Sequence, residues 1–216
     1  MQLKIHSTED FNVCGTGSSR EWDKADWQEL VLVGGNPLAP YQTKIKVLYS
    51  KTGIYFLYYC EDKKLVNTMT KDFDDIYNED VVELFFQPDQ NQRLYFEYEL
   101  SPLNVELPIM VPNDGKSQFF GWLPWHYEGA RKIVHQTSAI GGRKESLASV
   151  KGWIAEMFIP FALFKGLLNC PPVKGTIWKG NLYRIDYDSD PARWAWCPDT
   201  GTNFHDYLRF GEWLFD

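Results

Sequence analysis

Carboxylates and aromatic rings are concentrated in residues 72–88, DFDDIYNEDVVELFFQP. The acidic first half is expected to be a loop, whereas residues 81–86 are β-branched and aromatic enough to form a strand that ends in a turn. Side chains alternate along a strand, so Glu83 shares one face with Val81 and Phe85. A carboxylate in such an apolar row is either held in an ion pair, placed on a solvated face, or free to accept hydrogen bonds from a ligand.

A second pair of carboxylates follows in the next expected strand, residues 94–100, LYFEYEL. Alternation places Glu97 and Glu99 on one face of that strand. If the two strands are antiparallel neighbours, same-face residues come within the separation of about 5–9.5 Å that the two carboxyl groups of a glycoside hydrolase require. Glu83 with Glu97, Glu99 or Asp80 is therefore one hypothesis for a catalytic pair. Serine-based catalysis has little support, because no G-x-S-x-G motif occurs.

Composition narrows the classes of partner. The chain has 216 residues, enough for one domain with a substantial core, and we expect a single domain over residues 1–216. Its formal net charge of −7 and the lack of a basic run argue against a nucleic-acid partner, whose phosphates require clustered lysine and arginine. Aromatic residues make up 16% of the chain and include nine tryptophans, so some rings are expected to line a binding surface.

Strand-like patterns recur along the chain and helical patterns are rare. The further expected strands are residues 43–49, 54–60, 132–139, 153–159, 181–187 and 211–215. Residues 161–168 allow at most two helical turns, and residues 101–130 are too rich in proline for regular structure. The latter contain FFGWLPWHYEG, whose large rings could form a wall beside a cleft. Many short strands predict an all-β fold, a two-sheet antiparallel β-sandwich of the immunoglobulin or jelly-roll kind with little helix.

The cysteines and the N-terminus bear on the cellular compartment. The four cysteines are Cys14, Cys60, Cys170 and Cys197. They are far apart and lack metal-ligand spacing, which favours free thiols over two disulfides. The first residues contain no apolar signal-peptide segment, so a native Met1 would indicate the cytoplasm, whereas a signal peptide removed from a longer chain would indicate an extracellular or periplasmic protein. The longest apolar run, residues 157–164, is far shorter than the roughly 20 residues of a membrane helix, and no membrane span is expected.

Six motifs in order resemble the family 9 carbohydrate-binding modules and their stand-alone relatives. They are IYNEDVVELFFQP, YFEYELSP, WIAEMFIPF, NLYRID, WAWCP and FHDYLRFGEWLF, and the resemblance extends from about Lys44 to the end of the chain. It implies a β-sandwich of the DOMON-like kind and non-catalytic binding of a carbohydrate ligand. In the best-known members of that family a reducing-end sugar unit is held between two aromatic rings.

The resemblance also implies a set of ligand-binding residues. The aromatic ring that stacks on the sugar, six positions before the strand glutamate, corresponds to Tyr77, where the family's sugar binders carry tryptophan, and the polar acceptor corresponds to Glu83. The second ring corresponds to Trp196 or, alternatively, Trp194. The polar residues of the later strand correspond to Arg184 and Asp186. The family's arginine on the strand after Glu83 has no clear counterpart in YFEYEL, and Arg184 could take its place.

Two cofactor alternatives accompany this resemblance. Some DOMON-like sandwiches hold b-type haem through methionine and histidine, and the available side chains are Met69, Met110, Met157, His126, His135 and His205. Members of the carbohydrate-binding family often hold calcium away from the sugar site, and DFDD with Asp80 offers suitable oxygen ligands. The DxDxDG pattern is absent, so no calcium ligands are assigned. We expect that no cofactor is required and that calcium is the one metal to test.

Overall fold

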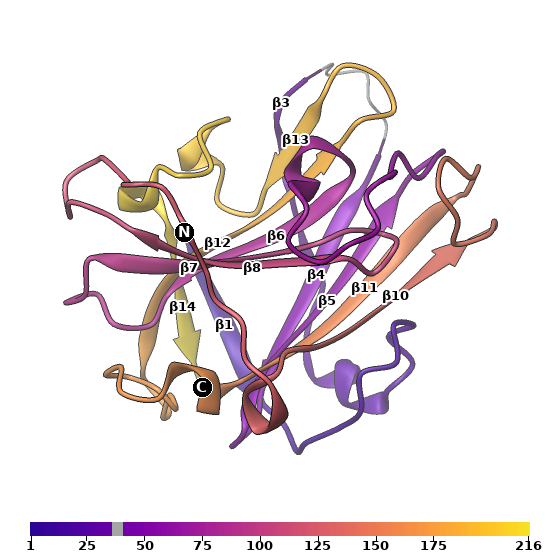
Figure 1. Cartoon of the computed structure of the whole chain (residues 1–216). Coiled ribbons are helices and arrows are strands. Elements are labelled where there is room, and N and C mark those ends of the chain that lie inside the picture. The colour runs from indigo at the N-terminus through magenta and orange to yellow at the C-terminus, as the bar shows by residue number, and fades with distance from the viewer. Residues whose placement is uncertain (36–40) are drawn as a thin grey trace.

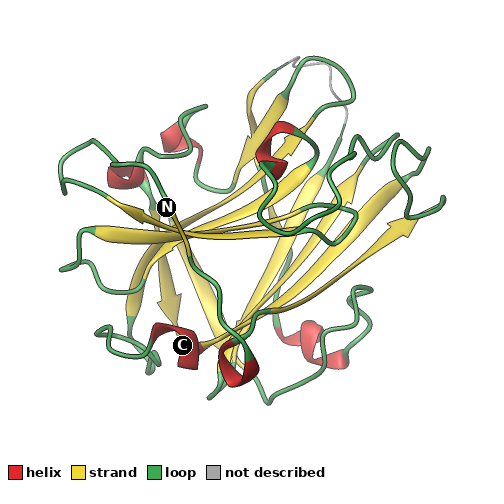
Figure 2. Ribbon diagram, in the orientation of Figure 1, coloured by secondary structure: helices red, strands yellow, loops and turns green. Residues whose placement is uncertain are grey.

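The computed structural model describes residues 1–35 and 41–216, and in this part of the chain it contains strands and short 3₁₀ turns but no α-helix (Figure 2). The strands are β1 (Gln2–Ser7), β2 (Gln28–Glu29), β3 (Val31–Gly34), β4 (Thr43–Tyr49), β5 (Gly53–Glu61), β6 (Val81–Gln87), β7 (Leu94–Leu100), β8 (Glu106–Pro112), β9 (Leu123–Pro124), β10 (Val134–Ile140), β11 (Gly152–Pro160), β12 (Ile177–Asp186), β13 (Ala192–Ala195) and β14 (Gly211–Phe215). The 3₁₀ turns are η1 (Arg20–Lys24), η2 (Ile76–Asn78), η3 (Gly129–Arg131), η4 (Phe161–Phe164), η5 (Pro198–Thr200) and η6 (Tyr207–Arg209). The expectation of an all-β chain with little helix is therefore confirmed.

The strands form one large curled mixed sheet with the order β10-β11-β5-β4-β1-β14-β12-β6-β7-β8-β9. We call β4, β5, β10 and β11 the β5 half, and β6, β7, β8, β12 and β14, with β13 and β3 beside them, the β6 half (Figure 1). The arrangement differs from two separate antiparallel sheets because β1 pairs parallel with β14 through residues 2–5 and parallel with β4 through residues 6 and 7. Alternation of apolar residues does not reveal which neighbours a terminal strand has, so this link was not predictable from the sequence.

The main core fills the space between the two halves. The β5 half contributes Phe56 and Trp153, and the β6 half contributes Leu84, Phe86 and Trp213, all of them completely buried. Phe56 lies 5.7 Å from Trp213, measured between ring centroids, and Phe86 stacks on Trp213 at 6.1 Å. Burying a side chain such as Phe86 contributes roughly 1.5–3 kcal/mol, so these facing rings hold the curled sheet closed.

Smaller apolar clusters cover the two outer faces of the sheet. On the β6 half, Phe85 and Tyr183 are buried beneath Phe204 and Phe210, which come from the C-terminal part of the chain. On the β5 half, residues 11–25 lie over the sheet and bury Trp22. Glu156 of β11 ties down this N-terminal segment. Its carboxylate accepts hydrogen bonds from the backbone N–H of Gly15 at 2.7 Å and from Trp22 Nε1 at 2.8 Å.

Most expected strands lie where the sequence placed them, to within a few residues. Strands β4, β7 and β14 have the expected bounds. The main omission is β8, which lies within residues 101–130 and contains Pro108. Proline is tolerated there because β8 is followed in the sheet only by the two-residue β9 and so lies near an edge. The expected helical turns at residues 161–168 shorten to the 3₁₀ turn η4.

All four cysteines are unpaired, and Cys60 and Cys197 are buried. Free thiols were expected, and the structure agrees. Among the described residues, no helix has the length and apolar character needed to cross a membrane.

Candidate functional site

A cavity of about 440 Å³ opens on the outer face of the β6 half. It lies over β6, β7 and β12, and its rim is formed by η2, the segment around Phe119 and Trp122, and residues 202–205. Its lining residues are Tyr77, Asn78, Glu83, Phe85, Glu97, Glu99, Ile109, Phe119, Trp122, Ile185, Tyr187, Arg193, Thr202, Asn203, Phe204 and His205. We call it the glutamate cavity, because three glutamates form its polar floor.

The register of β6 and β7 brings these three glutamates together. Glu83 is directly opposite Glu99, and Phe85 is directly opposite Glu97, so all three carboxylates lie on the outer face. Glu83, Glu97 and Glu99 are only 2%, 4% and 1% exposed. Among the described residues, no group outside the three glutamates donates a hydrogen bond to Oε2 of Glu97 or to either carboxylate oxygen of Glu99, and a proton held between Glu97 and Glu99 is the hydrogen bond that they make with one another. Buried polar atoms are normally paired, so these unpartnered oxygens indicate a place where a ligand supplies the missing donors.

Burial makes the ionised form of these carboxyl groups costly. Burial raises the pKa of Glu97 to about 8. The pKa of Glu83 is raised well above its ordinary value, first by burial and then by the negative charge of Glu97, while Arg193 acts in the opposite direction. The pKa of Glu99 is also raised well above its ordinary value by burial, by Glu83 and by Glu97. The unliganded cavity therefore retains protons on its floor near neutral pH.

Aromatic rings form the walls of the glutamate cavity. Tyr77 is contributed by η2, and its backbone carbonyl accepts a hydrogen bond of 2.8 Å from the hydroxyl of Tyr187. Phe119 stacks on His205 with ring centroids 4.3 Å apart and an interplanar angle of 21°. Trp122 lines the cavity and is 42% exposed, so much of its ring is available to a ligand. The expectation that FFGWLPW forms a wall beside a cleft agrees with the positions of Phe119 and Trp122.

Positive charge in the glutamate cavity is limited to one side. Arg193 of β13 lines the cavity, and its positive charge partly opposes the rise in the pKa of Glu83. His205 Nδ1 shares a 2.7 Å hydrogen bond with the hydroxyl of Tyr95 and lies 3.9 Å from Glu97 Oε2. Burial lowers the pKa of His205 to about 4, so its imidazole is neutral near pH 7 and does not balance Glu97.

The structure brings Tyr77 and Glu83 together in this cavity but places the other four expected site residues elsewhere. Tyr183 is the residue of β12 opposite Glu83, whereas Arg184 is opposite Val82. Arg184, and Asp186 two residues later, therefore point to the opposite face of the sheet from Glu83. The indoles of Trp194 and Trp196 are 2% and 0% exposed and belong to the main core. Trp196 packs so closely on Gly211 that a Cβ atom there would come within 2.3 Å of its ring.

Arg184 instead belongs to a buried ionic network. Its guanidinium contacts Asp186 Oδ2 at 2.6 Å, Asp62 Oδ2 at 3.2 Å and Thr43 Oγ1 at 3.0 Å, and stacks 5.1 Å from the ring of Trp194. Asp62, Asp186 and Asp188 each offer an oxygen within 4.8 Å of the others, a spacing that suits a cation. Arg184 already supplies positive charge to two of these carboxylates. A calcium ion would therefore compete with the guanidinium for this cluster.

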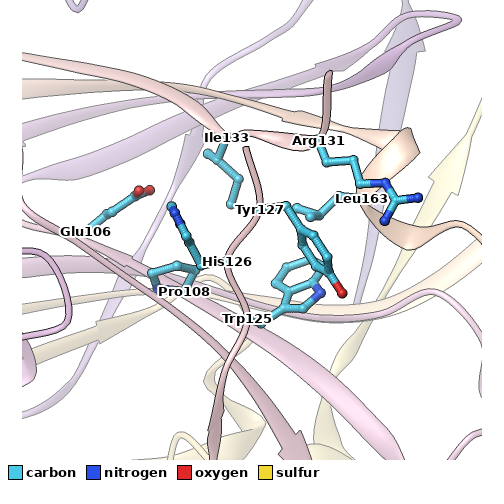
Figure 3. A pocket seen from close by; sticks show the side chains of 8 residues that line it. All are labelled: Glu106, Pro108, Trp125, His126, Tyr127, Arg131, Ile133 and Leu163. Carbon is cyan, nitrogen blue, oxygen red and sulfur yellow. The ribbon is translucent and has the colours of Figure 1, made fainter. Parts of the chain in front are cut away.

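A second recess, lined by Glu106, Pro108, Trp125, His126, Tyr127, Arg131, Ile133 and Leu163, is much smaller (Figure 3). Its volume of about 10 Å³ is close to the minimum for a single water molecule. Glu106 accepts a 2.9 Å hydrogen bond from the hydroxyl of Tyr98, and the Arg131 guanidinium lies 5.3 Å from the Tyr127 ring. These side chains satisfy one another, so the recess serves packing rather than binding.

Asp80 was considered as a calcium ligand, and the methionines were considered as haem ligands. Asp80 is completely buried and accepts hydrogen bonds from the backbone N–H of Val66 and Tyr187, which gives it a structural role. Of the methionines proposed as haem ligands, Met157 lies in the main core. Within the described part of the chain, no methionine lines the glutamate cavity beside His205. Pairing of Glu83 with Glu99 remains the geometry relevant to a hydrolase.

Comparisons with known proteins agree with this architecture. Residues 13–215 match the family described as "Carbohydrate family 9 binding domain-like". A protein named "Extracellular protein" from Arthroderma benhamiae is 27% identical over 182 residues, which cover 81% of this chain and 78% of that protein.

Solved structures share the fold at low sequence identity. A candidate carbohydrate-binding protein from Bacteroides uniformis superposes with a TM-score of 0.77 at 16% identity, covering 100% of this chain and 99% of that one. A family 9 carbohydrate-binding module from Caldicellulosiruptor kristjanssonii, solved with cellotriose, superposes with a TM-score of 0.68 at 16% identity, covering 99% of this chain and 94% of that one. The same module solved with glucose gives a TM-score of 0.67. Because the family match spans nearly the whole chain, the protein belongs to the carbohydrate family 9 binding domain-like family.

Proposed function

We propose that the chain binds a mono- or oligosaccharide in the glutamate cavity without transforming it. The observation that carries this proposal is the combination of unpartnered buried carboxylate oxygens on the floor and exposed aromatic faces on the walls. The volume of about 440 Å³ lies within the range of roughly 300–1,000 Å³ that is usual for small-molecule sites. Membership of a family named for carbohydrate binding, and the cellotriose and glucose complexes of the Caldicellulosiruptor kristjanssonii module, support the choice of ligand class.

The chemistry of a pyranose matches this environment. Its C–H faces lose water when they stack on an aromatic ring, whose negative face attracts them. Its hydroxyl groups point outward in the plane of the ring and require donors and acceptors there. Tyr77 and Trp122 offer ring faces, and Glu83, Glu97 and Glu99 offer acceptors. Hydrogen bonds to a charged acceptor are roughly twice as strong as those to a neutral one.

We further propose that the unit bound is a terminal one, held at its reducing end, with Tyr77 as one ring and Glu83 as an acceptor. Trp122 or Phe119 then supplies the opposing ring that Trp194 and Trp196, buried in the core, do not offer. A cavity with a floor and rim receives the end of a chain more readily than its middle.

Calorimetric titration of glucose, cellobiose and cellotriose tests the proposal. For a small polar ligand in a partly open site we expect dissociation constants between millimolar and micromolar, roughly −4 to −8 kcal/mol. Cellotriitol, whose reducing end is an open chain, should bind at least tenfold more weakly than cellotriose. Tyr77→Ala should weaken binding, and the control Tyr127→Ala, an exposed tyrosine outside the cavity, should not. Absence of binding by every saccharide tested would refute the proposal.

A glycoside hydrolase is the second candidate, favoured by one observation: Glu83 and Glu99 are cross-strand neighbours with raised pKa values. Glycoside hydrolases cleave the glycosidic bond with a protonated carboxylic acid as general acid and a second carboxyl group as nucleophile or general base. Incubation with aryl glycosides separates the two functions. We expect no turnover, whereas turnover that disappears in Glu83→Gln would show that the site is catalytic.

A further inference from the structure

The glutamate cavity has more hydrogen-bond acceptors than a neutral sugar can satisfy. Three carboxyl groups lie on adjacent strands with their side chains on one face, and three of their oxygens are buried without a partner. Each sugar hydroxyl carries one donor hydrogen and two acceptor lone pairs, so a neutral pyranose brings further acceptors of its own to a floor whose donors are the protons held by the carboxyl groups themselves.

The cavity also has more acidic than basic side chains. Arg193 acts to lower the pKa of Glu83, although burial and the charge of Glu97 keep that pKa well above its ordinary value. Among the described residues, Glu99 has no ion-pair partner, and the basic group nearest to Glu97 is His205 at 3.9 Å, which is neutral near pH 7. Two buried carboxyl groups, Glu97 and Glu99, are therefore left without a cation from the protein.

From this surplus we infer that the preferred ligand of the glutamate cavity is an amino sugar, a saccharide that carries a free ammonium group in place of a hydroxyl. The inference rests on the proposed carbohydrate-binding function and specifies its ligand class. An ammonium group has three N–H donors and no acceptor, which complements the unpartnered oxygens of Glu97 and Glu99. Its positive charge also favours ionisation of these carboxyl groups, so that their protons are released on binding and the hydrogen bonds to the ammonium are charge-assisted.

The walls of the cavity are compatible with a cation. Tyr77 and Trp122 present aromatic faces, and such faces attract an ammonium group that lies within about 6 Å of the ring centre. Phe119 and Phe204 add apolar surface to the lining, and the attraction between an ammonium and a carboxylate is stronger beside such surface than in bulk water. An acetylated amine would lose both the charge and two of the three donors.

Three matched sugars with free reducing ends test the inference: glucosamine, glucose and N-acetylglucosamine. They share one ring and differ only at carbon 2, where they carry an ammonium, a hydroxyl or an acetamide. Calorimetry at a pH below the pKa of the amine should show glucosamine binding at least about tenfold tighter than glucose, and the acetylated sugar no tighter than glucose. Equal affinities, or tighter binding of glucose, would overturn the inference.

Three variants assign the preference to the floor. Glu97→Gln and Glu99→Gln keep the shape of the side chain and should each reduce the ratio of glucosamine to glucose affinity toward one. Arg193→Met removes the competing cation and should raise that ratio. The control is Glu106→Gln. Glu106 is a buried glutamate of β8 that lies opposite Leu100 of β7, a core residue, and so points away from the cavity. This substitution should leave the ratio unchanged. A ratio that is the same in Glu97→Gln, Glu99→Gln and the wild type would also overturn the inference.

Failure of this inference can be told apart from failure of the proposed function. If cellotriose and glucose bind and glucosamine has no advantage, the cavity is a carbohydrate site and the preference for an amine is wrong. If no saccharide of either series binds, the carbohydrate site itself is refuted. Circular dichroism of each variant confirms that a change in the ratio comes from a folded protein.

Discussion

Glu83 of β6 lies directly opposite Glu99 of β7, and both side chains point to the outer face of the sheet. Like charges placed across a strand pair destabilise a sheet. Glu97, two residues from Glu99, adds a third carboxyl group to the same face. Burying three carboxyl groups side by side costs folding stability, because desolvation disfavours their charged forms and their mutual repulsion adds to that cost. The loss is measurable.

Glu97→Gln should stabilise the protein more as the pH rises. Because burial raises the pKa of Glu97 to about 8 in the folded state, this group favours folding fully only below its unfolded value of about 4.3, and the favourable contribution is lost as the pH rises toward 8. The neutral amide does not titrate. The stability of the variant relative to wild type should therefore grow between pH 4 and pH 8, by an amount on the order of a few kcal/mol.

Denaturant unfolding of both proteins at a series of pH values checks this prediction. The control is Glu128→Gln, which removes an exposed carboxylate far from the cavity. Its stability should follow that of the wild type at every pH. Parallel curves for Glu97→Gln and wild type would mean that Glu97 is ionised without penalty, which would contradict the buried floor described above.

Trp122→Ala and Trp196→Ala should have opposite effects, because one ring is 42% exposed at the cavity and the other is completely buried in the core. Loss of Trp196 should cost roughly 3–5 kcal/mol of folding free energy and lower the melting temperature by roughly 6–20 °C. Loss of Trp122 should leave melting nearly unchanged and weaken saccharide binding by about 1–2 kcal/mol. Thermal melts with calorimetric titration measure both quantities. Early melting of Trp122→Ala would place that ring in the core.

Alternation along single strands predicted correctly which face of its strand each of the three glutamates occupies. Glu83 lies on one face with Val81 and Phe85, and Glu97 lies on one face with Glu99, because a strand has only two faces and a period of two. Only side chains on the same face of two adjacent strands can contact one another, so alternation also limits which residues of neighbouring strands can meet. That is why the three glutamates could be considered together from the sequence.

The residues on the other side of the site could not be predicted in this way. Both faces of β12 mix apolar and polar side chains, with Leu182 beside Arg184 on one face and Asn181 beside Tyr183 on the other, so alternation does not say which face turns toward the main core. The register with β6 decides it by placing Tyr183 opposite Glu83, and Arg184 then points inward. The aromatic walls come from loops, such as the one that carries Trp122, whose paths depend on long-range packing rather than on local sequence pattern.

Glu156→Ala should release the N-terminal segment without altering the cavity. Its carboxylate accepts hydrogen bonds from the backbone N–H of Gly15 and Cys14 and from the indole of Trp22, so its removal leaves two buried donors, Gly15 N–H and Trp22 Nε1, unpaired. Each unpaired donor costs about 1–3 kcal/mol. Hydrogen exchange of residues 14–22 should accelerate more than that of β6 and β7. Saccharide affinity should stay at the wild-type value, and a loss of affinity would show that the two faces of the molecule are coupled.

Arg184→Ala should destabilise the protein and create a response to calcium. Removing the guanidinium leaves Asp62 and Asp186 buried without their cation, a change that typically costs about 3–5 kcal/mol. Burial already raises the pKa of Asp62 to about 7 despite Arg184, so this carboxyl group tolerates ionisation poorly. Calcium could then take the vacated position, because Asp62, Asp186 and Asp188 offer oxygens within 4.8 Å of one another. Melting in the presence of calcium and of a chelator should show a larger calcium-dependent shift for Arg184→Ala than for wild type.

A second substitution assigns that calcium response to the cluster. Asp188→Asn in the Arg184→Ala background removes the charge of one of the three carboxylates while keeping its size. The calcium-dependent shift in melting temperature should then fall, since calcium affinity depends on the number of charged oxygen ligands. The exposed Asp199 serves as the matched control, and Asp199→Asn in the same background should preserve the shift. A wild-type shift as large as that of Arg184→Ala would contradict competition between calcium and the guanidinium, and would place any calcium site away from Asp62, Asp186 and Asp188.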